Sequence, residues 1–130
     1  MKQNWCKIGL IQRHSFKIYK VRDYTIFWKI EIKGQKIIQS IILDNNDLIL
    51  LMETSEMDFD IYYSLQIYKL EKDNYILNQI IENDDKGYRE KETRGGCLIR
   101  RLIFSVKNII KLSNNRFITI SNHGFKVYSL

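Results

Sequence analysis

The chain has 130 residues and a mass of 15.7 kDa, which is enough for one domain with a hydrophobic core. Its 45% apolar and 28% charged residues exclude a wholly disordered chain. The net charge of +6 permits binding to nucleic acid or to acidic membranes, but the basic residues are interleaved with Asp and Glu, which is typical of a solvated surface. No apolar run is long enough to cross a bilayer.

The cysteines and the first residues indicate a compartment. Cys6 and Cys97 are far apart, and neither has the spacing of a metal site. No apolar segment follows Met1, so the sequence gives no sign of secretion. We therefore expect a cytoplasmic protein with free thiols, no membrane partner, no metal and no cofactor.

The residue types favour β-structure. The apolar residues are mainly Ile, Leu, Tyr and Phe, and the chain contains neither Ala nor Pro. Ile, Tyr and Phe favour strands, whereas Ala is the strongest helix former. We therefore expect an all-β fold of antiparallel strands in one domain over residues 1–130.

The first predicted group of strands spans residues 1–33. Strands are expected over 5–12 and 16–20, joined by a turn at Arg13-His14-Ser15, with a further strand over 24–32. If each complete group has four strands, a to d, this group supplies strands b, c and d.

The second predicted group spans residues 37–82 and supplies strands a to d. An apolar strand over 37–43 ends in the polar turn 44–47, and strands c and d are expected over 64–70 and 75–81. The acidic connection 53–63 predicts a protruding hairpin between strands b and c.

Residues 83–96 contain Asp84-Asp85-Lys86-Gly87 and Arg94-Gly95-Gly96, which predict an exposed loop. The third group spans 97–130, and its first residues, 97–104, are compatible with either an extra strand or a short helix. Strands a, b and c then follow, with the polar turn Ser113-Asn114-Asn115 between a and b and the turn Asn122-His123-Gly124 between b and c.

A repeat links the three groups. Residues 11–20 (IQRHSFKIYK) and 120–129 (ISNHGFKVYS) align without a gap, so that Tyr19 matches Tyr128. A third copy, SLQIYKL at 64–70, places Tyr68 in the same position. The tyrosines are separated by about fifty to sixty residues, slightly more than the roughly 40–50 of a propeller blade.

Residues 112–130 resemble the a–b–c core of a WD-repeat β-propeller blade. In that family a Ser-x-Asp-Gly-type turn joins strands b and c, and strand c ends in Trp-Asp. Here Asn122-His123-Gly124 replaces the turn, and Tyr128-Ser129, Tyr68-Lys69 and Tyr19-Lys20 replace the dipeptide. The resemblance implies about two to three degenerate four-stranded antiparallel blades and a non-catalytic scaffold for protein–protein interaction.

Propellers close with four to eight blades, and fewer than three are expected here. An open stack of this size leaves strand edges and sheet faces uncovered. Three outcomes are open: part of a longer propeller chain, assembly with itself or with another subunit, or closure as a small sandwich or barrel. We favour the first two.

His14 and His123 are the only histidines, and they occupy the same position of the repeat. This equivalence favours a structural role in the turn between strands b and c, where an imidazole bonds to nearby backbone, over metal binding or acid–base work.

Six aspartates form three acidic pairs: Asp44 and Asp47, Asp58 and Asp60, and Asp84 and Asp85. All lie in predicted turns, where Asp bonds to local backbone, and none belongs to a twelve-residue calcium loop. The sequence contains no nucleotide-binding glycine motif and no nucleophile motif, so we expect no catalytic residue and no enzyme.

The stretch from Lys86 to Arg101 is the most basic local feature. Its arginines, namely Arg89, Arg94, Arg100 and Arg101, are the candidate partner contacts. Tyr88 lies among them, and a basic patch with an aromatic residue suits nucleic acid. Acidic neighbours dilute this charge. A small basic β-domain that binds RNA or DNA is therefore the alternative to the protein-binding scaffold.

Overall fold

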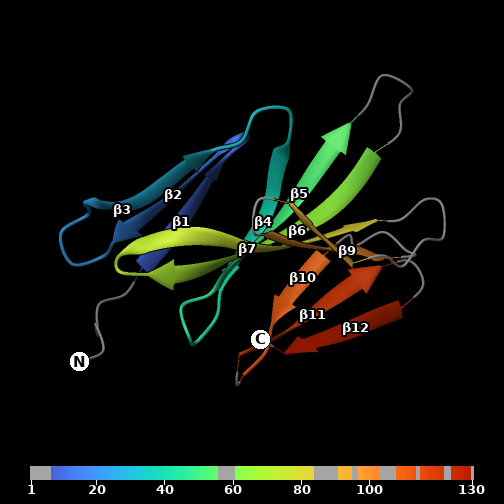
Figure 1. The fold of residues 1–130 in the computed structure, drawn as a ribbon. Helices are drawn as coiled ribbons and strands as arrows, with labels where there is room; N and C mark the ends of the chain where they lie inside the picture. Colours follow the sequence, from blue (N-terminus) through green and yellow to red (C-terminus); the bar gives the residue numbers. More distant parts are fainter. Residues whose placement is uncertain are drawn as a thin grey trace.

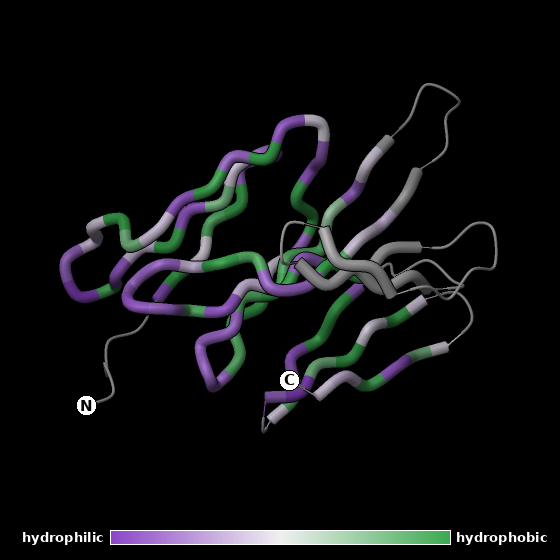
Figure 2. Tube along the Cα trace, viewed as in Figure 1, coloured by the Kyte–Doolittle hydropathy of each residue, from purple (hydrophilic) through white to green (hydrophobic). Residues whose placement is uncertain are grey.

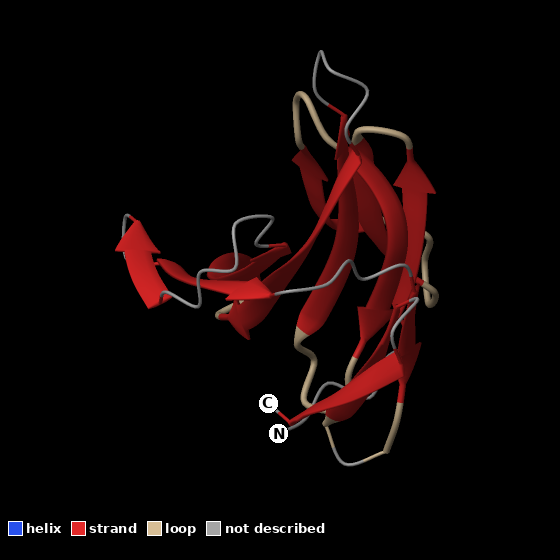
Figure 3. Ribbon diagram, turned by 90° about the vertical axis from the view of Figure 1, so that its right-hand side faces the viewer, coloured by secondary structure: helices blue, strands red, loops and turns tan. Residues whose placement is uncertain are grey.

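The described part of the chain folds into strands alone. The computed structural model describes residues 7–55, 61–83, 91–94, 97–102, 108–113, 115–121 and 124–129. Within these ranges there are twelve strands and no helix, so the expected all-β class is confirmed (Figure 3). Consequently, no helix in this part of the chain is long and apolar enough to span a membrane.

The first three strands form the N-terminal sheet. They are β1 (Lys7–Gln12), β2 (Ser15–Lys20) and β3 (Ile26–Glu31), paired antiparallel in the order β1-β2-β3. Gln12 pairs with Ser15 across the turn, and Arg13 adopts the left-handed conformation there (φ 49°). Because side chains alternate between the faces of a strand, Phe16 and Ile18 share one face of β2 and are fully buried.

The central sheet begins with four antiparallel strands in chain order. They are β4 (Lys36–Ile42), β5 (Leu48–Ser55), β6 (Ile61–Glu71) and β7 (Asn74–Asn83). Strand β5 starts with five consecutive apolar residues, 48–52, and all five are fully buried. A strand without polar alternation is typical of a sheet that is covered on both faces.

Two further strands extend the central sheet and correct the expectation for residues 83–104. β8 (Lys91–Arg94) lies in the predicted loop, and β9 (Cys97–Leu102) is a strand that pairs with β7 of the central sheet rather than with the third group. The β7–β9 pairing is also parallel, which departs from a purely antiparallel blade. This pairing has a physical reason. The edge of β7 that faces away from β6 carries backbone N–H and C=O groups, and pairing with β9 gives these groups hydrogen-bond partners.

The C-terminal sheet contains the last three strands. They are β10 (Asn108–Lys111), β11 (Arg116–Ser121) and β12 (Gly124–Ser129), antiparallel in chain order. Asn115 precedes β11 with φ 59°, and Asn46 precedes β5 at the corresponding place with φ 73°. Asn tolerates this left-handed region better than most residues, which explains the polar turns that the sequence places there.

The three sheets stack face to face, with the central sheet between the other two (Figure 1). One core lies between the N-terminal and central sheets and contains Phe16, Ile18, Leu50 and Tyr68 among others. The other lies between the central and C-terminal sheets. It contains Ile49, Leu51, Leu65, Ile67, Phe117 and Tyr128 among others. Figure 2 shows that hydrophilic residues predominate at the turns and that most apolar residues lie within strands.

The three repeat tyrosines lie on the strands expected to correspond. Tyr19 on β2 pairs with Ile8, and Tyr128 on β12 pairs with Phe117, in the same register. Tyr68 on β6 pairs with Leu48. A β-bulge interrupts the pairing with the next strand immediately before Tyr19 and, again, immediately before Tyr68. The repeat in the sequence is therefore also a repeat in strand order and register.

Candidate interaction surfaces

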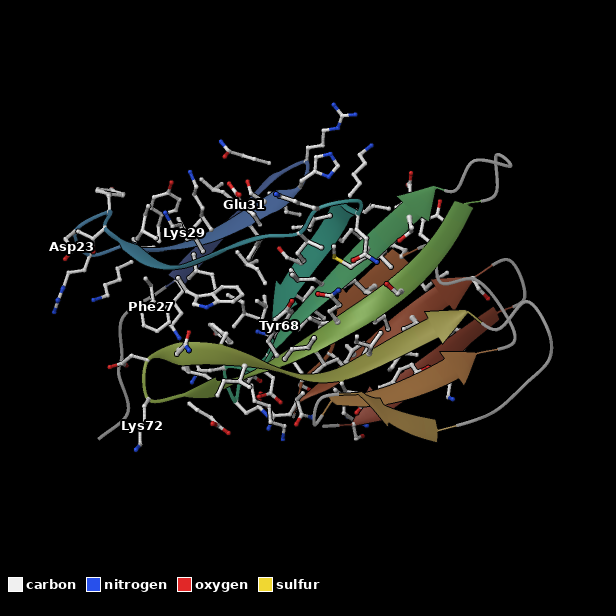
Figure 4. All side chains as sticks on the ribbon, turned by 45° about the horizontal axis from the view of Figure 1, so that its top comes forward. Asp23, Phe27, Lys29, Glu31, Tyr68 and Lys72 are labelled. Carbon is white, nitrogen blue, oxygen red and sulfur yellow. The ribbon has the colours of Figure 1, made fainter. Side chains whose placement is uncertain are left out.

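The interface between the N-terminal and central sheets is rich in aromatic contacts. Trp28 of β3 packs edge-on against Tyr68 and Tyr75, with ring centroids 5.5 and 5.2 Å apart. Figure 4 shows Tyr68 between the two sheets. Such pairs add specific geometry to the burial of apolar area. Backbone bonds also join the turn of β1 and β2 to the next connection, because the Ile32 and Ile37 N–H groups donate to the carbonyls of His14 and Arg13.

The interface between the central and C-terminal sheets combines an apolar core with polar contacts at its edge. Phe117 and Tyr128 stack within the C-terminal sheet with centroids 5.1 Å apart, and both are buried against the central sheet. At the edge, the Asn45 N–H donates to Asn115 Oδ1 at 2.7 Å, and Lys111 Nζ lies 3.1 Å from Asp44 Oδ1. Both polar contacts join the turn between β4 and β5 to the C-terminal sheet.

The two interfaces share one polarity. Each sheet has a face that carries the repeat tyrosine, which is called the tyrosine face below, and an opposite face. In the central and C-terminal sheets the tyrosine face points to the preceding sheet, since Tyr68 and Tyr128 belong to those cores. The opposite face points to the following sheet: Ile18 of β2 packs on the central sheet, and Ile67 of β6 packs on the C-terminal sheet.

This polarity leaves one face of each outer sheet uncovered by the described part of the chain. On the tyrosine face of the N-terminal sheet, Ile8, Leu10 and Ile26 are 47%, 51% and 48% exposed. On the opposite face of the C-terminal sheet, Phe125 is 71% exposed and Val127 is 45% exposed. Exposed apolar residues that gather on one face are typical of an interaction site.

The exposed face of the C-terminal sheet is hollowed. Ile118, Ile120, Ser121, Gly124 and Phe125 line a hollow of about 360 Å³. The strand pairing explains the lining, because Ile118 lies opposite Val127 and Ile120 lies opposite Phe125. Two strands thus present the same apolar face. This surface was not predicted, although the apolar alternation of β11 and β12 is present in the sequence.

A second hollow, of about 390 Å³, lies beside His14. Its lining comes from the β1–β2 turn and from the end of β3 with the turn that follows, and comprises Gln12, Arg13, His14, Ser15, Glu31, Ile32, Lys33 and Gly34. The His14 Nδ1 atom lies 2.6 Å from the carbonyl oxygen of Gln35, so the imidazole bonds to backbone, as expected for a turn histidine. The matching residue of the repeat, His123, lies outside the described residues.

In the described part of the chain, three ionisable groups have shifted pKa values. Burial raises the pKa of Tyr75 to about 12, and the negative charge of Asp47 adds to this effect. Burial also lowers the pKa of Lys7, which lies over the ring of Phe27 at 4.7 Å, while nearby Asp73 acts in the opposite direction.

The third shift lies at an exposed turn. The side-chain and backbone hydrogen bonds from Thr25 hold the pKa of Asp23 below its usual range. In Figure 4 Asp23 lies at the tip of the N-terminal sheet. The shifts of all three groups follow from packing and turn structure. No group of three or more metal-ligating residues occurs in the part of the chain that is described.

The predicted basic contacts are placed only in part. Arg89 lies outside the described residues, and the structure gives the backbone of Arg94, Arg100 and Arg101 but not their side chains. The pairing of β8 with β9 puts Lys91 directly opposite Arg100, so that the strand pairing brings two of the basic residues together. Arg101 pairs with Glu82 on β7.

The first acidic pair has a turn role. Asp47 is buried, its N–H donates to Asn45 Oδ1, and its carboxylate accepts a bond from the Asn45 amide at 3.0 Å. Asp44 pairs with Lys111, as described above. Asp58, Asp60, Asp84 and Asp85 lie outside the described residues.

Comparison with known proteins adds no relative to this picture. No family model, curated protein or solved structure matches the chain. The surfaces described above are therefore the basis for assigning a function.

Proposed function

We propose that the chain is a non-catalytic β-propeller-type scaffold that mediates protein–protein interaction in the cytoplasm. The observation that carries the proposal is the apolar face of the C-terminal sheet, with Phe125 71% exposed beside a hollow lined by Ile118 and Ile120. The stacking of three sheets with one polarity supports the blade interpretation, because blades of a propeller also pack face to face in sequence order.

The physical case rests on the cost of exposing this face. Apolar surface gains roughly 25 cal/mol for each Å² removed from water, so a contiguous apolar face favours a partner that covers it. The strands beneath the face are paired in fixed register and packed on the central sheet. The backbone of the face is therefore already formed, and a partner loses little free energy in ordering it.

A site-specific photo-crosslinker tests the proposal. Placed at Phe125 of the full chain in living cells, it should form discrete protein adducts. The matched control is the same crosslinker at Lys72, an exposed residue at the β6–β7 turn that is labelled in Figure 4. Equal adducts at both positions, or none at Phe125, would refute an interaction through this face.

A second candidate, binding of RNA or DNA, is favoured by one observation. The register places Lys91 opposite Arg100, and Arg101 follows on the same strand. Basic residues that neighbouring strands bring close together along the chain are typical of a region that attracts anions. A nucleic-acid phosphate is such an anion.

The double variant Arg100→Ala/Arg101→Ala tests this candidate. If these residues hold phosphates, the affinity for single-stranded RNA or DNA should fall. The slope of the logarithm of the affinity against the logarithm of the salt concentration should also become shallower, by the equivalent of about two phosphate contacts. The matched control is Lys36→Ala/Lys69→Ala, which removes two exposed cations from β4 and β6 of the central sheet. Equal losses from both double variants would mean that only net charge matters.

A further inference from the structure

The exposed face of the C-terminal sheet corresponds, position by position, to two faces that are buried. The repeat aligns Phe16, Leu65 and Phe125, and Phe16 and Leu65 are fully buried, whereas Phe125 is 71% exposed. The position two residues further along the repeat shows the same difference in burial. Ile18 and Ile67 are fully buried, and the matching Val127 is 45% exposed.

The two buried faces are covered by the same kind of surface. The central sheet covers Phe16 and Ile18 with the face that carries Tyr68. The C-terminal sheet covers Leu65 and Ile67 with the face that carries Tyr128. In both interfaces, the opposite face of one sheet therefore packs on the tyrosine face of the next.

One tyrosine face in the described part of the chain has no sheet packed on it. It is the outer face of the N-terminal sheet, where Tyr19 is half-buried and pairs with Ile8, while Leu10 and Ile26 are about half exposed. Among the described residues, one outer face of each kind is therefore exposed. These are the two halves of an interface that the chain already forms twice.

We propose that a second copy of this chain covers the Phe125 face of the C-terminal sheet with the tyrosine face of its N-terminal sheet. Because each contact joins two different faces, two copies related by a twofold axis make it twice and leave neither face exposed. Three sheets in each copy then give a ring of six, within the four to eight blades that close a propeller. The proposal rests on the proposed function, because it identifies the partner of the same face.

The solution mass of the full chain is the first test. Sedimentation equilibrium or light scattering over a range of concentrations should give twice the mass of the 15.7 kDa chain, without larger species. A monomer at every concentration would overturn the proposal. So would a mass that keeps rising with concentration, because the ring would then not close at two copies.

Variants at the two faces give the sharper test. Phe125→Glu and Leu10→Glu lie on opposite outer sheets, and each should convert the dimer to a monomer. Ile76→Glu is the matched control: Ile76 is 45% exposed on β7, outside both faces, and its substitution should leave the dimer intact. Circular dichroism and a thermal transition similar to that of the unsubstituted chain establish that each variant is folded.

Mixing distinguishes this arrangement from a symmetric contact. Phe125→Glu keeps an intact tyrosine face, and Leu10→Glu keeps an intact Phe125 face. An equimolar mixture should therefore regain dimer at a higher concentration than the unsubstituted chain needs. If Leu10→Glu alone remains a dimer, the Phe125 faces bind each other and the proposal is wrong. If the chain is monomeric while crosslinks from position 125 capture another protein, the second copy is excluded and the scaffold function stands.

Discussion

Gly9 leaves room for the ring of Phe16 between β1 and β2. A Cβ atom at position 9 would lie 2.5 Å from Phe16 Cζ and 2.8 Å from Cε1, closer than real contacts allow. The ring is fully buried against the central sheet, so it has little space to move. We expect Gly9→Ala to lower the free energy of unfolding by about 1–3 kcal/mol, measured by urea denaturation, as for other overpacked cores.

The control for Gly9 is the same substitution beside a smaller neighbour. In a Phe16→Leu background, the ring atoms that would clash are absent, so Gly9→Ala should cost clearly less. An equal cost in both backgrounds would show that the loss comes from the backbone at position 9 and not from the ring.

Tyr75 couples stability to high pH. Its hydroxyl donates to the carbonyl of Asn46 at 2.8 Å, and burial raises its pKa to about 12, whereas an ordinary tyrosine ionises near pH 10. The folded state therefore keeps the proton more tightly than the unfolded state. The raised pKa of Tyr75 therefore adds to the free energy of unfolding. This addition is complete below about pH 10 and is lost as the pH rises to about 12.

Replacing Tyr75 by Phe removes both the hydrogen bond and the titration. At pH 7, Tyr75→Phe should lower the free energy of unfolding by about 0.5–1.5 kcal/mol. The difference from the unsubstituted chain should shrink as the pH rises above 10, in urea denaturation repeated at each pH. Tyr24→Phe is the control, because Tyr24 is 76% exposed and its replacement should leave the free energy of unfolding at pH 7 unchanged. A difference that stays constant with pH would contradict the assignment.

At the scale of the elements, two equivalent turns differ in the hydrogen bonds that their asparagine side chains form. Asn46 and Asn115 both adopt the left-handed conformation before a second strand, and Gly adopts this conformation at no steric cost. Only Asn115 also bonds to another sheet, through Oδ1 and the Asn45 N–H. Asn115→Gly should therefore lower the free energy of unfolding by about 1 kcal/mol more than Asn46→Gly. Equal effects in thermal or urea unfolding would mean that this bond between sheets contributes nothing.

Much of the strand pattern was predictable because it is local. The alternation around Phe16 and the repeat of Tyr19, Tyr68 and Tyr128 predict strands and their correspondence before any coordinates are known. Strand β8 was missed because Lys91–Arg94 has no apolar alternation, although two glycines between neighbouring segments are a known signal of a hairpin. The parallel pairing of β9 was missed because it depends on a free edge of β7, which is a property of the fold.

The candidate surface could not be predicted for a similar reason. Phe16 and Phe125 lie in nearly identical sequence, FKIY and FKVY, yet one is fully buried and the other is 71% exposed. Their difference depends on whether another sheet follows in the stack. Local sequence predicts that a face is apolar, whereas the arrangement of the whole chain decides whether it is a core or an interface.

The central sheet holds the molecule together, because the other two sheets pack on its opposite faces. Leu50 and Leu51 are adjacent and fully buried, but Leu50 belongs to the core with the N-terminal sheet and Leu51 to the core with the C-terminal sheet. Each Leu→Ala substitution should cost about 2–5 kcal/mol. In a stack where each sheet contacts only its neighbours, each substitution should mainly destabilise the interface to which the replaced leucine belongs.

Amide hydrogen exchange of the two variants tests this independence. Leu50→Ala should speed exchange in β1–β3 and leave β10–β12 protected, and Leu51→Ala should do the reverse. The pair is matched, because both substitutions remove the same atoms from the same strand. If both variants speed exchange equally in both outer sheets, the stack unfolds as one cooperative unit. Both uncovered faces would then be lost in the same unfolding transition, and a partner bound to either face would stabilise all three sheets.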